Sequence, residues 1–162
     1  MTVKIQCFSV RNATTNKRIH SRKEYTMITY TENKKFTQQD AEKLFLSVGW
    51  LSGKYPSQLY KALINSSTVL TAWDNGRLIG LVRVMDDTLM TAFIHYVLVH
   101  PDYQGQGIAG RMIEMIKEKY KDFLYLELMP EESRNAAFYE NHGFSVMPDG
   151  VAMQIHNHGF AE

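Results

Sequence analysis

Val99-His100-Pro101-Asp102-Tyr103-Gln104-Gly105-Gln106-Gly107-Ile108-Ala109-Gly110 is the stretch of this sequence that decides its fold. A β-rich run, residues 90–99, ends at it, and apolar residues recur at helical spacing from Ile108 to Tyr120. Glycine in such a turn lets the backbone approach a ligand closely. The first turn of the following helix presents unpaired N–H groups at the positive end of the helix dipole. The stretch therefore predicts an anion site suited to a phosphate or pyrophosphate.

Two helices are predicted before this turn. Thr37 followed by Asp40 resembles a capping box, and the apolar residues after it share one helical face up to Gly49. Pro56 is suited to the first position of a second helix, which runs to residue 64. The loop between them carries Trp50.

The strands predict a mixed α/β domain. Residues 68–73 and 78–84 are joined through Asn75-Gly76, a strong hairpin signal, because both central residues need a positive φ. The strand at 90–99, the helix from Ile108 and a buried strand at 123–128 predict a parallel βαβ crossover. The last expected elements are a helix over 133–141 and strands over 144–147 and 151–155.

Composition excludes several classes. The chain has 162 residues and one cysteine, Cys7, and no run approaches the roughly 18 to 20 apolar residues that span a bilayer. The N-terminus has no apolar signal core, and one thiol forms no internal disulfide. We expect a cytoplasmic protein with no membrane partner.

Charge divides the chain at Met27. Residues 1–26 carry six basic side chains and one acidic one, a formal charge of +5, whereas residues 27–162 hold 12 basic and 16 acidic side chains, a charge of −4. Four interpretations of the basic N-terminal extension stay open: an extended start before an initiator at Met27, a targeting peptide, a nucleic-acid-binding arm, or an arm that packs on the body. The nucleic-acid interpretation is the weakest, because the cations are spread out. We therefore expect residues 27–162 to form the single functional domain.

The glycines also satisfy the pattern G-x-G-x-x-G of dinucleotide-binding folds, with Glu127 at a suitable distance. In those folds, the glycines follow the first strand almost directly, whereas residues 100–104 intervene here and antiparallel strands precede the turn. No Gly-Lys-Ser/Thr follows, so a phosphate-binding P-loop is excluded. A nicotinamide-dependent oxidoreductase is thus a distant alternative.

The sequence resembles the GNAT superfamily of N-acetyltransferases, whose signature is Gln/Arg-x-x-Gly-x-Gly/Ala after a strand that ends Val-x-Pro. Here it stands as residues 99–109, and a second element of the superfamily stands as Phe138-Tyr139-Glu140-Asn141-His142-Gly143-Phe144. The resemblance covers about residues 27 to 155. Within the superfamily, Leu44 to Trp50 together with Ile94 to Gly107 is similar to bacterial and plastid arylalkylamine acetyltransferases.

The resemblance implies a GNAT-like α/β (α+β) fold, with a mixed, mostly antiparallel central sheet and a βαβ core that binds acetyl-CoA. The pyrophosphate of acetyl-CoA would lie on backbone amides of the glycine turn, and the pantetheine arm would fill a gap between the strand before the turn and residues 126–128. Relatives often place an Asn before the second element; here the substitutes are Ser133 and Asn135. The implied acetyl-CoA contacts are Leu98, Val99, Gln104, Gly105, Gln106, Gly107, Ile108, Ala109, Gly110, Ser133 and Asn135.

Three side chains are candidates for the chemistry. Tyr139 matches the tyrosine of the second element and would donate or share a proton with the leaving thiolate. An amine arrives mostly protonated at neutral pH, and His95 matches a histidine on this strand in animal arylalkylamine enzymes, so it is the first candidate base. Tyr96 is the second, and water is the alternative. Strict alternation predicts His95 on the face of Val97 and Val99, unless a bulge swaps the faces.

The predicted activity is acetyl transfer from acetyl-CoA to a primary amine by direct attack, since residues 27–162 contain no thiol for a covalent intermediate. A small arylalkylamine or polyamine is the expected acceptor, since the body is acidic and Trp50, Tyr55 and Phe93 can form an aromatic wall. The alternatives are a protein or peptide N-acetyltransferase and a non-catalytic acyl-CoA-binding module. We expect a monomer or homodimer, no nucleic-acid partner and no metal, because His156 and His158 lack a third ligand.

Overall fold

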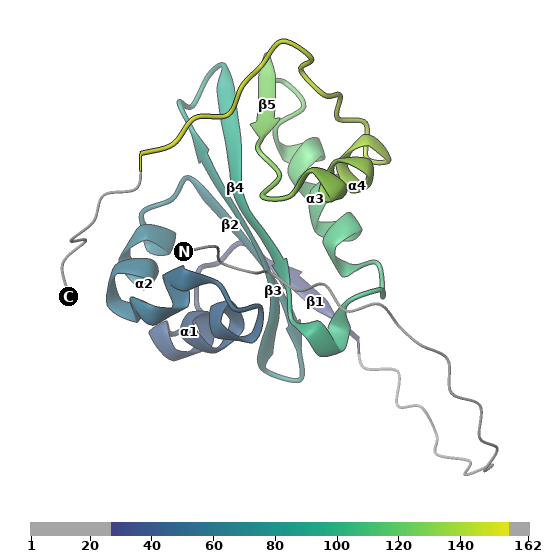
Figure 1. Ribbon diagram of the computed structural model, residues 1–162. Coiled ribbons are helices and arrows are strands. Elements are labelled where there is room, and N and C mark those ends of the chain that lie inside the picture. The colour runs from purple at the N-terminus through teal and green to yellow at the C-terminus, as the bar shows by residue number, and fades with distance from the viewer. Residues whose placement is uncertain (1–26, 156–162) are drawn as a thin grey trace, which may run out of the picture.

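The computed structural model describes residues 27–155, which fold around one five-stranded sheet (Figure 1). The strands lie in the order β1-β2-β3-β4-β5, and every neighbouring pair is antiparallel except β4 and β5, which are parallel. This is the mixed, mostly antiparallel sheet that the sequence predicts. The strands are β1 (Thr29–Thr31), β2 (Thr68–Asp74), β3 (Arg77–Asp86), β4 (Thr91–Val99) and β5 (Tyr125–Leu128).

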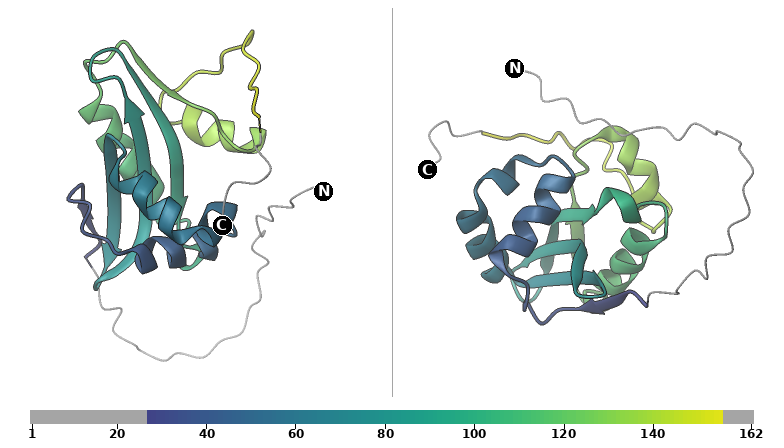
Figure 2. Two further views of the ribbon diagram at one scale, coloured as in Figure 1. Left: turned by 90° about the vertical axis from the view of Figure 1, so that its left-hand side faces the viewer. Right: turned by 90° about the horizontal axis from the view of Figure 1, so that it is seen from below.

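Helices cover both faces of the sheet (Figure 2). Helices α1 (Gln38–Ser47) and α2 (Pro56–Ile64) cover one face, and α3 (Ile108–Lys119) covers the other. Each layer buries its own apolar cluster, one around Phe45 and Leu63 and the other around Met112 and Ile113. The remaining helices are α4 (Ala136–Glu140) and the short 3-10 helices η1 (Leu51–Lys54), η2 (Pro101–Tyr103) and η3 (Ser133–Asn135).

Local signals in the sequence produce two of these elements as expected. Thr37 caps α1, with its hydroxyl accepting from the amide of Asp40 while the carboxylate of Asp40 accepts from the amide of Thr37. Asn75 and Gly76 join β2 to β3 with φ of 46° and 80°, as a tight hairpin turn requires. The predicted capping box and hairpin are both confirmed.

The crossover from β4 through α3 to β5 positions the candidate site. The two parallel strands pair only from Thr91 with Tyr125 to Ile94 with Leu128. β4 then continues to Val99, where it pairs with β3 but no longer with β5. The C-terminal half of β4 therefore has one edge without a strand partner among the described residues.

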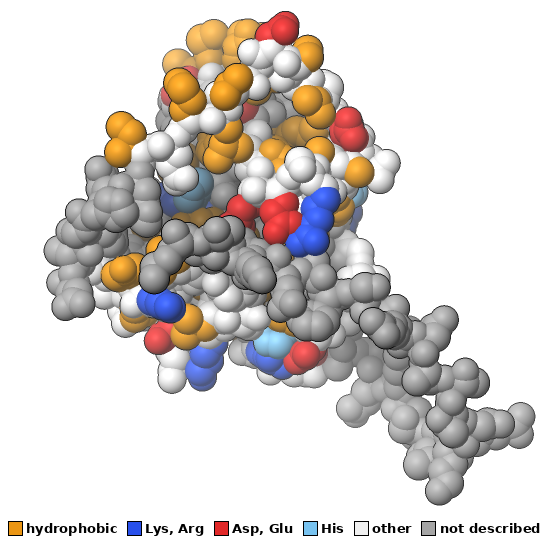
Figure 3. Space-filling model, in the orientation of Figure 1, with side chains coloured by type: hydrophobic (Ala, Val, Ile, Leu, Met, Phe, Trp, Pro, Cys, Tyr) orange, Lys and Arg blue, Asp and Glu red, His pale blue; other side chains and the backbone are white. Residues whose placement is uncertain are grey.

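The C-terminal part differs from the prediction. Residues 144–147 and 151–155 form no strand, and β5 is half-exposed rather than buried, with Tyr125 53% exposed. A strand needs partners for its backbone groups, and the four residues of β5 offer only a short edge. The expected last helix is divided into η3 and α4. The upper part of Figure 3 shows the resulting apolar surface, to which Val146, Met147, Val151, Met153 and Ile155 contribute.

Candidate functional site

The glycine turn leaves the N-terminus of α3 open. Gly105 and Gly107 have φ of 75° and 79°, in the left-handed region that favours glycine. Gly107 is the N-cap of α3, and no side chain caps the helix there. The first amides of α3, at Ile108 and Ala109, are thus available to an anion. Gln104 steadies the turn, because its Nε2 donates to the carbonyl of Val99 at 3.0 Å.

The three glycines have different roles. A Cβ built at Gly105 or Gly107 would meet nothing within 4 Å, so these two serve backbone conformation and leave the surface open. A Cβ at Gly110 would lie 2.9 Å from Cε1 of His142. Gly110 therefore lets the turn after α4 pack closely on α3, a role that the glycine pattern in the sequence did not indicate.

The end of β4 borders the turn. Leu98 and Val99 are only 4% and 7% exposed and belong to the clusters on opposite faces of the sheet. Their side chains are core, so the strand offers a ligand its backbone edge, which lacks β5 beyond Ile94. Across the gap, Leu126 and Leu128 of β5 are half-buried and pack on the α3 cluster.

Tyr139 lies on α4 among aromatic rings. Its ring centroid is 5.0 Å from that of Phe138 and 5.9 Å from that of Phe144. Burial raises the pKa of Tyr139 to about 12, so the phenol is protonated throughout the physiological range. Its hydroxyl makes no hydrogen bond with any residue between 27 and 155 and can donate to a ligand. Ser133 and Asn135 precede α4 in and beside η3, and both are exposed.

A β-bulge corrects the predicted faces of β4. Arg83 of β3 pairs with Tyr96, whereas the next residue, Val84, pairs with Ile94, so His95 is an extra residue in β4. Ile94 and Val97 both pack with the α3 cluster, and Tyr96 packs with the α1–α2 cluster. Strict alternation, which would put Tyr96 on the face of Ile94, therefore fails at His95, and the alternative of a bulge holds.

His95 and Tyr96 lie together as a result of the bulge, with ring centroids 4.1 Å apart. An aromatic wall surrounds Tyr96, whose ring centroid is 5.0 Å from that of Phe45 and 5.4 Å from that of Trp50. The hydroxyls of Tyr96 and Ser52 are hydrogen-bonded at 2.9 Å. Trp50 and Tyr96 are partly buried, whereas Phe45 is 0% exposed and belongs to the core behind them.

Arg83 is the site residue that the sequence motifs did not indicate. Its Nη1 donates to Nδ1 of His95 at 3.0 Å, and its guanidinium lies 5.5 Å from the ring centroid of Tyr96. Because a guanidinium only donates, Nδ1 of His95 must accept, and the ring proton of neutral His95 lies on Nε2. Burial and the charge of Arg83 both lower the pKa of His95, so the neutral form dominates at neutral pH. Only the pairing of β3 with β4, which places Arg83 opposite Tyr96, could have identified Arg83 as a site residue.

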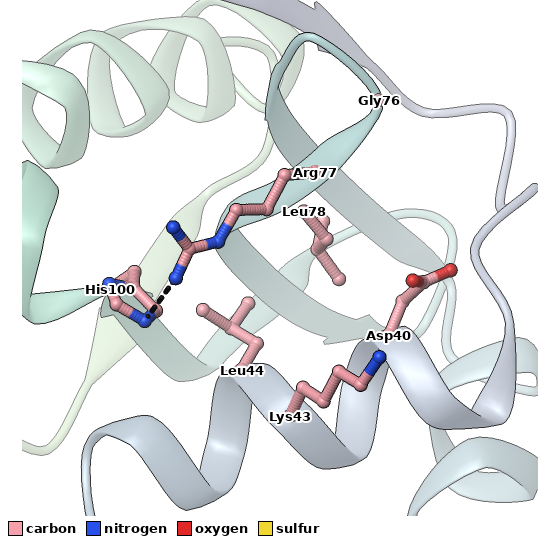
Figure 4. Close-up of a pocket in the computed structure, with 7 residues that line it drawn as sticks. All are labelled: Asp40, Lys43, Leu44, Gly76, Arg77, Leu78 and His100. Carbon is pink, nitrogen blue, oxygen red and sulfur yellow. Dashed lines mark hydrogen bonds between the residues drawn. The ribbon is translucent and has the colours of Figure 1, made fainter.

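A separate cavity of about 450 Å³ lies between α1 and the β2–β3 hairpin, and none of the predicted site residues lines it (Figure 4). Within it, Nη2 of Arg77 and Nε2 of His100 are 2.7 Å apart. Between residues 27 and 155, no group of three His, Cys, Asp or Glu side chains is placed to hold a metal ion. No helix in that range is long and apolar enough to cross a membrane. His156 and His158 lie outside the described residues, as does the N-terminal extension.

A model of the acetyltransferase (GNAT) family matches residues 29–144. The chain belongs to this family. Among solved structures, a GNAT acetyltransferase from Streptococcus pneumoniae TIGR4 superposes with a TM-score of 0.70 at 28% identity, and the match covers 81% of this chain and 98% of that one. The GNAT fold expected from the two motifs is therefore confirmed.

Two curated relatives also match the GNAT chain. Uncharacterized N-acetyltransferase ycf52 of Gracilaria tenuistipitata var. liui is 37% identical over 120 residues, which cover 69% of this chain and 64% of that protein. Histone acetyltransferase TAP1 of Glycine max is 33% identical over 125 residues, which cover 69% and 53% of the two chains. This GNAT chain thus spans between half and two thirds of these relatives. Both relatives are named acetyltransferases, and neither name points to the narrower arylalkylamine type.

Proposed function

We propose that the chain transfers the acetyl group of acetyl-CoA directly to a primary amine. The observation that carries this proposal is the uncapped N-terminus of α3 beside the edge of β4 that β5 leaves unpaired. The N-terminus of α3 suits an anionic group, and the unpaired edge of β4 suits an extended arm that carries amides. Acetyl-CoA contains both.

The glycine turn is the proposed contact for the pyrophosphate. The hydrogen-bond donors are the backbone amides from Gln104 to Ala109, with Gly110 at the edge of this set. The dipole of α3 supplies positive charge. The pantetheine amides lie along the backbone of Leu98 and Val99. Ser133 and Asn135, exposed near α4, are the proposed polar contacts on the other side.

Tyr139 acts on the leaving thiolate. Its pKa of about 12 lies above the value of about 8.5 for an ordinary thiol, so complete proton transfer from the phenol to the thiolate is unfavourable. A hydrogen bond from the phenol to the developing negative charge needs no such transfer, and buried donors stabilise charge strongly. Tyr139 therefore shares its proton with the sulfur, and solvent later protonates the thiolate.

The amine loses its proton before attack, and the geometry favours water over His95 as the acceptor. Protonation of His95 at Nδ1 would break its hydrogen bond with Arg83 and place two cations side by side. Tyr96, hydrogen-bonded to Ser52, is the second candidate. His95 instead presents Nε2–H as a donor.

A small amine with an aromatic or apolar body is the proposed acceptor. Trp50 and Tyr96 give it a wall at the point where β4 and β5 stop pairing. Arg83 on the same face disfavours a polyamine, because like charges repel. A protein acceptor is the second candidate, since the soybean relative is named a histone acetyltransferase.

Thiol release from acetyl-CoA, measured with tryptamine, serotonin, spermidine, lysine and a lysine-containing peptide, tests this function. We expect amine-dependent release, with the aromatic amines ahead of spermidine. Preference for the peptide would favour the second candidate. Tight binding of CoA without turnover of any amine would contradict the proposal and favour a non-catalytic acyl-CoA-binding module.

A further inference from the structure

We infer that the acceptor amine carries an anionic group, a carboxylate or a phosphate, and that Arg83 and Nε2–H of His95 bind this group. The inference rests on the proposed function and narrows its substrate class. It departs from the expectation, drawn in part from the acidic composition of residues 27–162, that the acceptor is a small arylalkylamine or polyamine.

Arg83 lacks an acidic partner among the described residues. Its side chain is half-buried, and burial lowers the pKa of the guanidinium. It forms no ion pair with an acidic residue in the described part of the chain. Its hydrogen bonds go to neutral groups: Nε donates to Oγ of Ser66 at 2.7 Å, Nη1 to Nδ1 of His95 at 3.0 Å and Nη2 to Sδ of Met85 at 3.4 Å. The Tyr96 side chain also interacts with the guanidinium, which lies 5.5 Å from its ring centroid. A buried charge is costly unless it is paired, so an anion is the expected complement.

Arg83 and His95 together supply several hydrogen-bond donors. A guanidinium has five N–H groups, and the three contacts leave one N–H on each terminal nitrogen of Arg83. The third contact is to a thioether, which is a weak acceptor. His95 is exposed and adds Nε2–H, because Nδ1 accepts from Arg83. Neighbouring donors of this kind suit a carboxylate or phosphate, which accept several hydrogen bonds at once.

Arg83 and His95 lie beside the point where β4 and β5 stop pairing. The bulge places His95 and Tyr96 together beside Arg83, immediately after Ile94, the last residue of β4 that pairs with β5. The same place has the aromatic wall of Trp50 and Tyr96. An amine with an apolar body and an acidic group matches this combination of wall, cation and donor.

Matched acceptors test the inference with the unmodified full chain. Tryptophan and tryptamine differ by a carboxylate, and O-phosphoethanolamine and ethanolamine differ by a phosphate. We expect kcat/KM for at least one acid-bearing amine to exceed that of its partner about tenfold or more, as one charge-assisted contact predicts. The pair that shows it identifies the anion. Equal or better use of both acid-free partners would overturn the inference and leave the proposed function intact, whereas no turnover of any amine would overturn both.

Variants of Arg83 separate recognition from a structural role. Arg83→Gln should raise KM for the acid-bearing amine about 10- to 100-fold and lower kcat/KM for this amine at least tenfold more than for its acid-free partner. Equal losses for both amines would show a structural role and overturn the inference. Arg83→Lys keeps the charge without the planar fork and should lose the same selectivity to a smaller degree, which provides a test even where Arg83→Gln folds poorly. Lys61→Gln removes an exposed cation from α2 and is the matched control.

Discussion

Replacement of Tyr139 by phenylalanine removes one hydroxyl and keeps the ring. The hydroxyl has no hydrogen-bond partner between residues 27 and 155, whereas the ring packs against Phe138 and Phe144. Tyr139→Phe should therefore leave Tm and the KM for the amine nearly unchanged. Any loss of rate then reports on the chemistry.

The pKa of Tyr139 sets the expected size of that loss. About 12 for the phenol against about 8.5 for a thiol is a difference of about 3.5 units, or about 4.8 kcal/mol against complete proton transfer. What the variant loses is a hydrogen bond to developing charge, worth about 1.5 to 3 kcal/mol. In the single-turnover rate constant for acetyl transfer, this corresponds to a fall of about 10- to 150-fold.

Rapid-quench measurement of single-turnover acetyl transfer checks this value. Tyr125→Phe, at an exposed position of β5, is the control and should retain the parent rate. The parent enzyme should also show no alkaline loss of rate attributable to Tyr139 below about pH 11, because the phenol stays protonated there. A Tyr139→Phe rate within twofold of the parent would refute the proposed role.

Further outcomes follow from the turn, the bulge and one exposed carboxylate. Gly107→Ala should raise KM for acetyl-CoA about 5- to 30-fold, because a left-handed alanine costs about 1 to 2 kcal/mol, and an unchanged KM would contradict the anion site. Gly110→Ala, which crowds His142, should lower Tm in a melting curve and change that KM little. In the His95→Gln variant, kcat/KM should still rise with pH up to the pKa of the amine, as in the parent enzyme. If kcat/KM of the parent instead levels off just above pH 6.5 and the variant loses this plateau, His95 is the base. Hydrogen bonds from the amides of residues 89–91 lower the pKa of Asp87 in the folded protein. The ionised carboxylate therefore stabilises the fold at any pH above its ordinary pKa of about 3.9, and this stabilisation is lost as the pH falls through the lower pKa of the folded state. Asp87→Asn should accordingly lower Tm at pH 7, with a difference that disappears in acid.

Local signals in the sequence were sufficient for most of the fold. The capping box at Thr37, the Asn75-Gly76 turn and the helical spacing after Ile108 each depend on a few neighbouring residues, and each formed as expected. The uncapped N-terminus of α3 was predictable for the same reason. Glycines at positions 105 and 107 fix the backbone without help from distant residues.

Features that depend on pairing between distant segments were not predictable. The bulge that the sequence left open is a property of the register between β3 and β4, so its position at His95 could not be fixed, and alternation alone would put Tyr96 on the face of Ile94. Arg83 belongs to no motif and joins the site only through that register. The alternating pattern of 151–155 predicted a strand, but a strand requires a partner edge, which this segment does not have in the structure.

The proposed activity of the protein is direct acetyl transfer from acetyl-CoA to a primary amine. The most direct test measures, in the same reaction, the thiol released and the N-acetylated amine formed, over the panel that includes the acid-bearing acceptors. We expect equal amounts of the two products, both dependent on the amine. Thiol release that is independent of the amine, or CoA binding without either product, would contradict the account.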